Sequence, residues 1–99
     1  MNAPITEADV RKEIRDYLSA MGWFIFHIHQ QGYRAYKGIS DYIAVKHGVT
    51  IYVEVKKPGG TQSPEQIQFE DNIVSHGGLY FCVDNLDKLI RQIDGHGIR

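Results

Sequence analysis

The hydrophobic positions near the start of the chain repeat with the period of a helix. Thr6 followed by Asp9 is typical of a capping box, so a helix is expected to begin just after Thr6. The pattern stops at Gly22, where the helix should end. The stripe on which this prediction depends consists of Val10, Ile14, Tyr17, Leu18 and Met21.

Three short runs that follow are rich in β-branched and aromatic residues, which favours strands. They span residues 23–29, 41–46 and 50–57. Residues 30–40, with Gly32 and Gly38, are expected to form a loop between the first run and the second. The short segment 47–49 joins the second run to the third, and this predicts a hairpin.

The second half of the chain continues with a helix, a strand and another helix. Ser63 is a candidate N-cap, with Pro64 at the first helical position and Gln66 completing a capping box. This helix should reach Gly77, and residues 79–83 should form a buried strand. A last helix is expected from Asp84 or Asn85, followed by a frayed tail over residues 95–99.

The resulting order, αβββαβ(α), predicts an α/β fold with a mixed four-stranded sheet flanked by helices. The first three strands should be antiparallel neighbours. The strand over residues 79–83 should return parallel through the second helix, by a right-handed crossover.

Composition adds bounds on size and location. The chain has 99 residues, of which 42% are hydrophobic, and residues 1–99 are expected to form a single domain. No apolar run approaches the ~20 residues of a membrane span, and the N-terminus lacks a basic segment that leads into an apolar one. Cys82 is the only cysteine, so an intrachain disulfide is excluded. We therefore expect a cytoplasmic protein with no membrane partner.

The net charge of -1 argues against a protein that holds nucleic acid by bulk electrostatics. Five basic residues nevertheless gather in the central third, which predicts a local positive surface. Within it, Tyr33, Arg34 and Lys37 mix aromatic and basic side chains in the loop before Asp41. This segment is a candidate contact for a DNA backbone, and the alternative is a merely solvated loop. The five basic residues are Arg34, Lys37, Lys46, Lys56 and Lys57.

Strand parity brings charged residues to one face of the predicted hairpin. Side chains alternate across a strand, so Glu54 and Lys56 point to the same face, opposite the aliphatic Val53 and Val55. Asp41 begins the partner strand and can approach Glu54 if the register allows. Two carboxylates held close together repel, and a divalent cation relieves the repulsion.

Hard oxygen ligands without cysteine favour Mg²⁺ or Mn²⁺. Asp41 and Glu54 are the candidate ligands, with the backbone carbonyl of Val55 as a third, and Lys56 is the candidate catalytic cation. The alternative is a solvated strand face, because an E-x-K triplet occurs in roughly one in three chains of this length by composition alone. The pairing with Asp41 is what favours the catalytic interpretation.

Four motifs in order resemble those of one family. They are TEADV at residues 6–10, KGISD at 37–41, EVKKPGG at 54–60 and SPEQ at 63–66. Together they resemble the VRR-NUC branch of the PD-(D/E)xK nucleases, whose core fold is related to that of archaeal Holliday-junction resolvases and restriction endonucleases. The resemblance runs from Thr6 to about Ile93 and implies a restriction-endonuclease-like core.

The resemblance also assigns roles by position. Asp41 matches the family's aspartate, and Glu54 with Lys56 matches its E-x-K. Glu7 is similar to a glutamate that the first helix aims at the metal, although an acid there also favours the helix dipole. Gln66 resembles the family's motif glutamine, although the capping box alone would explain it. Family members usually have proline where Ser40 stands.

The function implied is Mg²⁺- or Mn²⁺-dependent endonucleolytic hydrolysis of DNA. Small stand-alone relatives, often carried by phages, act as homodimers, which suits branched substrates such as Holliday junctions or flaps. No small-molecule cofactor is expected. A non-catalytic DNA-binding or partner-docking module and an RNA-directed nuclease are the alternatives. The candidate catalytic residues are Glu7, Asp41, Glu54, Lys56 and Gln66, and the candidate DNA contacts are Tyr33, Arg34, Lys37 and Lys57.

Overall fold

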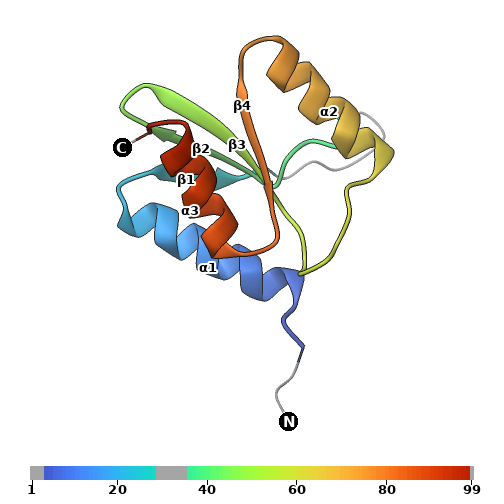
Figure 1. Ribbon diagram of the computed structural model, residues 1–99, viewed down its shortest axis with the longest axis horizontal. Helices are drawn as coiled ribbons and strands as arrows, with labels where there is room; N and C mark the ends of the chain where they lie inside the picture. Colours follow the sequence, from blue (N-terminus) through green and yellow to red (C-terminus); the bar gives the residue numbers. More distant parts are fainter. Residues whose placement is uncertain (1–3, 29–35, 99) are drawn as a thin grey trace.

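The structure is a computed structural model, and it describes residues 4–28 and 36–98 (Figure 1). Its helices and strands follow the predicted order along the chain. They are α1 (Glu7–Ala20), β1 (Phe24–His27), β2 (Tyr42–Lys46), β3 (Val49–Val55), α2 (Pro64–Ser75), β4 (Leu79–Val83) and α3 (Leu86–Gly95).

One mixed sheet of four strands has the order β1-β2-β3-β4. β1 pairs antiparallel with β2, β2 pairs antiparallel with β3, and β4 runs parallel to β3. The sequence prediction of three antiparallel strands followed by a parallel fourth strand is thus confirmed. β3 lies in the interior of the sheet between β2 and β4, and Ile51, Val53 and Val55 on its aliphatic face are fully buried.

The element boundaries differ from the expected ones in small ways that have local causes. β1 spans only Phe24–His27 because the backbone N–H of Trp23 instead donates to the carbonyl of Leu18, 2.9 Å away, and closes the end of α1. The predicted end of this strand at His29 lies outside the described residues. The hairpin turn is the pair His47-Gly48, with φ of 50° and 80°, so β3 already begins at Val49. Two consecutive positive φ values are typical of a two-residue hairpin turn.

Helices cover both faces of the sheet. α1 and α3 lie next to each other in Figure 1 and pack on one face, where Ile14, Leu18 and Leu89 are fully buried against the aliphatic residues of β3. α2 lies apart from them and packs on the opposite face. There the ring of Phe69 contacts Tyr52 and Tyr80, with centroids 5.9 and 6.0 Å away. None of the helices in the described ranges is long and apolar enough to cross a membrane.

Candidate active site

Asp41 and Glu54 face each other where β2 and β3 separate. The register pairs Tyr42 with Val53, so the next pair outward is Asp41 and Glu54 on the face that α2 covers. The Asp41 carboxylate accepts a hydrogen bond from the backbone N–H of Val55 at 2.8 Å. The carbonyl of Asp41 accepts another from the N–H of Ile28 at 2.9 Å. The predicted hairpin made an approach of Asp41 to Glu54 possible, and the structure shows this approach, with Asp41 held by backbone hydrogen bonds.

Glu54 is a buried carboxyl group with one unsatisfied oxygen. Its residue is 2% exposed. Oε1 accepts a hydrogen bond from Nε2 of Gln66 at 3.1 Å, while Oε2 is buried and has no hydrogen-bond partner among the described residues. Burial, and next the charge of Asp41, raise the pKa of Glu54 to about 9. The site therefore calls for a proton or a cation beside this carboxyl group.

Gln66 joins the second helix to this carboxyl group. Its Oε1 accepts a hydrogen bond from the backbone N–H of Ser63 at 2.8 Å, and the backbone N–H of Gln66 donates to the Ser63 hydroxyl at 3.2 Å. The predicted capping box is therefore formed. Its Nε2 is left over for Glu54. The side chain of Gln66 therefore both caps α2 and contacts the candidate site, the two explanations that the sequence left open.

Gly38 lets the segment before Asp41 pack against the start of α2. Its φ is +83°, and a Cβ atom there would lie 2.1 Å from the backbone carbonyl oxygen of Glu65. No residue with a side chain fits such an approach. The contact sets the distance between Asp41 and Gln66, which both line a cavity of about 530 Å³.

Ser40 replaces the proline that the resemblance led us to expect, and it is buried. Its hydroxyl donates to the carbonyl of Tyr42 at 3.3 Å. This side-chain bond holds the backbone next to Asp41 in place of a proline ring.

Glu7 pairs with Arg11, one turn further along α1. The Nε of Arg11 lies 3.9 Å from Oδ1 of Asp41, so Arg11 stands between the two carboxylates. The described residues contain no group of three or more His, Cys, Asp or Glu side chains that could hold a metal ion. Glu7 has the weakest effect on the pKa of Glu54 among the causes of its shift, and its role as a ligand stays a prediction.

Arg11 is the residue of this site that the sequence reasoning missed. The signal was the spacing of four between Glu7, Arg11 and Arg15, which places them on one helix face.

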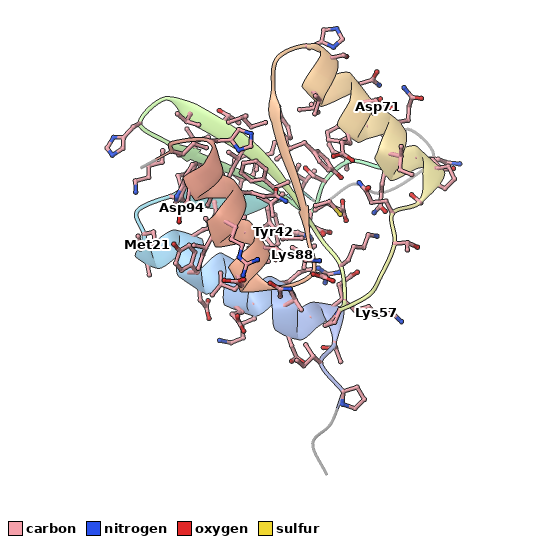
Figure 2. All side chains as sticks on the ribbon, viewed as in Figure 1. Met21, Tyr42, Lys57, Asp71, Lys88 and Asp94 are labelled. Carbon is pink, nitrogen blue, oxygen red and sulfur yellow. The ribbon has the colours of Figure 1, made fainter. Side chains whose placement is uncertain are left out.

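The remaining candidate residues lie around the carboxylate pair. Lys56 is half-buried, and its charge lowers the pKa of Glu54, opposite to the larger effects of burial and Asp41. Lys37 is exposed and lines the same cavity as Asp41. Lys57 is exposed on the segment that follows β3 (Figure 2). The predicted DNA contacts Tyr33 and Arg34 lie outside the described residues.

The oxygen atoms at the end of β3 fit a hard divalent cation. Asp41 and Glu54 supply carboxylates, and Oε2 of Glu54 lacks the partner that a buried acceptor needs. Because the N–H of Val55 points to Asp41, its carbonyl leaves the strand on the same side. The residues present therefore suit Mg²⁺ or Mn²⁺ and do not suit a soft metal.

A mixed sheet with this topology, flanked by helices and carrying a carboxylate pair between β2 and β3, defines a restriction-endonuclease-like α/β fold. A solved structure described as a VRR_NUC domain is similar to this chain, with a TM-score of 0.76 and 23% sequence identity. The match covers 90% of this chain and 96% of that one. No family model and no curated protein matches the sequence. The chain has the fold of a VRR_NUC domain, and the resemblance drawn from the four motifs is confirmed at the level of the fold.

Proposed function

We propose that this chain is a single-domain, metal-dependent endonuclease that hydrolyses phosphodiester bonds in DNA. The observation that carries the proposal is Glu54, buried beside Asp41 with one oxygen unbonded. Burial and the charge of Asp41 raise the pKa of this carboxyl group to about 9, so without a cation it keeps a proton. A divalent cation between the two carboxylates can take the place of that proton.

Asp41, Glu54 and the carbonyl of Val55 would hold Mg²⁺ or Mn²⁺, with Glu7 as a further candidate ligand. The ion, when bound, supplies Lewis acidity toward a phosphoryl oxygen and toward water. Glu7 can contribute if Arg11, its present partner, turns away.

The protein's own side chains do the positioning. The Val55 amide holds Asp41, and the Gln66 amide holds Glu54, so both carboxylates keep their orientation during the reaction. The ammonium group of Lys56, on the same face as Glu54, orients the attacking water and stabilises negative charge that develops on the phosphate. Lys37 and Lys57, with Tyr33 and Arg34, are proposed contacts to the DNA backbone.

Branched DNA, such as a Holliday junction or a flap, is the proposed substrate, and a homodimer is the proposed active form. A domain this small has little surface with which to grip a duplex, and two sites related by a two-fold axis suit a branched substrate. Exposed aromatic residues support an assembly: Phe24 and Phe26 are 67% and 41% exposed on the edge strand β1, and their rings contact each other. A cytoplasmic location stays a prediction.

Cleavage of a labelled synthetic four-way junction and of a linear duplex in Mg²⁺ tests the proposal. The wild type should cut the junction in preference to the duplex, and Glu54→Ala and Lys56→Ala should lose at least about 100-fold in rate. Undiminished cleavage by both variants would contradict the assignment of Glu54 and Lys56 to a nuclease active site. A matched RNA junction in the same assay decides between DNA and RNA.

The second candidate function is a non-catalytic DNA-binding or partner-docking module. The Asp41 and Glu54 pair counts against it, because a module that only binds a polyanion gains nothing from two carboxylates near the phosphates. Calorimetric titration with Mn²⁺ separates the two, since the enzyme should bind the ion and the module should not.

A further inference from the structure

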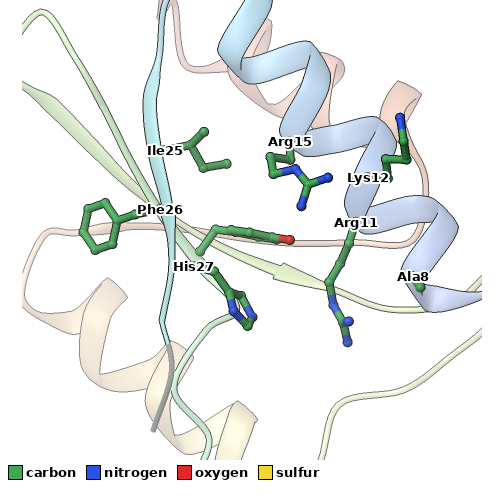
Figure 3. A pocket seen from close by; sticks show the side chains of 8 residues that line it. Ala8, Arg11, Lys12, Arg15, Ile25, Phe26 and His27 are labelled. Atoms are coloured by element: carbon green, nitrogen blue, oxygen red, sulfur yellow. The ribbon is translucent and has the colours of Figure 1, made fainter.

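A second cavity, of about 380 Å³, lies between α1 and β1 (Figure 3). Its volume lies within the range typical of binding sites for small molecules. Its polar lining comes from Arg11, Lys12 and Arg15 on α1 and from His27 and Tyr42 on the sheet, whereas the ring of Phe26 points away from it on the other side of β1 (Figure 3). We call this cavity the α1–β1 groove.

The α1–β1 groove carries three cationic side chains, and no carboxylate of residues 4–28 or 36–98 lines it. Lys12 and Arg15 contact Asp16 at 2.7 and 3.9 Å, but these ion pairs are exposed, with Lys12 71% and Arg15 51% exposed. Exposed pairs of this kind contribute little free energy, so both cations remain available to a ligand. In a chain of net charge -1, this is a strong local concentration of positive charge. The ligand that suits it is an anion.

Arg11 connects the groove to the carboxylate pair. Its guanidinium lines the groove, while its Nε lies 3.9 Å from Asp41 and is buried with no hydrogen-bond partner among the described residues. Tyr42, the first residue of β2, lines this groove, and Asp41, the residue just before it, lines the cavity of Gln66. An extended anion in the groove would therefore lead directly to the carboxylates.

The exposed ring of His27 adds an aromatic surface to the groove. It packs on the ring of the buried Tyr42, with centroids 5.1 Å apart. Basic side chains combined with aromatic ones are typical of grooves that follow a nucleic-acid strand. A free inorganic anion would need only the cations.

We propose that the α1–β1 groove binds the sugar–phosphate backbone of the DNA strand next to the bond that is cut, with Arg11, Lys12 and Arg15 as phosphate contacts. The proposal rests on the proposed function, because it takes the groove to guide the substrate of that same site. It gives the first helix a role in binding that its sequence did not suggest.

Equilibrium binding of a labelled four-way junction in EDTA, at 50 to 200 mM salt, tests the proposal without cleavage. Lys12→Gln and Arg15→Gln should each weaken binding about 3- to 10-fold and lower the magnitude of the slope of log affinity against log salt by about one. The double variant should show both losses of affinity and both decreases in slope together. Arg91→Gln is the matched control, because Arg91 is an exposed cation on α3 that pairs with Asp87 at 2.8 Å, as Lys12 pairs with Asp16. The affinity of this variant for the junction should equal that of the wild type. Unchanged affinity and slope in the double variant would overturn the proposal.

Two further comparisons separate the possible failures. If the wild type cuts the junction and the double variant binds it normally, the groove proposal fails while the nuclease stands. If the wild type cuts nothing and the double variant still loses binding, the groove stands as a contact for the DNA backbone while the proposed nuclease function fails. Junctions with 5′-phosphate and 5′-hydroxyl ends should bind equally, and a preference for the phosphorylated end would overturn the assignment to internal backbone phosphates.

Discussion

Nε2 of Gln66 donates a hydrogen bond to Oε1 of Glu54 across 3.1 Å, while the other amide atom of Gln66 caps the helix from which the side chain projects. A helix start and a buried carboxyl group are thereby joined through one side chain. The capping box holds the amide in the orientation in which its N–H group points at Glu54. The position of α2 on the sheet therefore determines the orientation of the carboxylate.

Replacement of Gln66 should separate its capping role from its role at Glu54. Gln66→Ala removes both, and we expect cleavage to fall about 10- to 100-fold, as is usual when a group that orients a metal ligand is lost. Ser63→Ala removes a capping bond and leaves Glu54 untouched, so it should lose about 1 kcal/mol of stability and keep its activity. Thermal unfolding and junction cleavage of both variants check this. Equal activity of the two would contradict it.

Stability of the metal-free protein should fall as the pH rises. The pKa of Glu54 is about 9 in the folded chain and near 4.5 when unfolded, so between these values only the folded state keeps the proton. This contribution of Glu54 is complete below pH 4.5 and is lost progressively up to pH 9. Glu54→Gln should remove this slope and gain about 1–3 kcal/mol near pH 8.

Denaturant unfolding in EDTA at pH 5 and pH 8 measures the effect. The difference between the wild type and Glu54→Gln should be larger at pH 8. A difference that is the same at both pH values would show that Glu54 is not held protonated by its surroundings.

Gly38 should be intolerant of a side chain for a reason that most glycines of this chain do not share. Gly38→Ala places a Cβ 2.1 Å from a backbone carbonyl of α2, so the helix must move and carry Gln66 with it. Gly48 has a similar φ, +80°, and nothing lies within 4 Å of an added Cβ. Gly48→Ala thus measures backbone strain alone, about 1 kcal/mol. Gly38→Ala should lose clearly more stability and also activity. Equal losses in unfolding experiments would count against the close packing.

Much of the fold was readable from local signals. Both capping boxes, at Thr6 and Ser63, mark helix starts that the structure confirms, and the alternation along β3 gave the buried face. The parity of Glu54 followed from the strand pattern, and the hairpin allowed an approach by Asp41 that the register then realises. These features depend on residues close together in the sequence, where period and turn chemistry decide the outcome.

The rest of the site depends on contacts between distant segments. The pairing of Arg11 with Asp41 and the packing of Gly38 on α2 are set by the tertiary arrangement, which no local pattern encodes. The candidate ligand Glu7 pairs with Arg11, one turn further along α1. Even the turn at His47-Gly48 was shorter than expected, because residue types alone do not fix where a strand resumes.

The central claim is that the pair Asp41 and Glu54 forms a metal-dependent site for DNA cleavage. Single-turnover cleavage of a four-way junction, measured across a Mg²⁺ titration that begins in EDTA, tests it most directly. The wild type should be inactive in EDTA and rise to a saturating rate, while folded Glu54→Gln should stay at least about 100-fold slower at every Mg²⁺ concentration. Cleavage in EDTA, or equal rates for the two proteins, would contradict the claim.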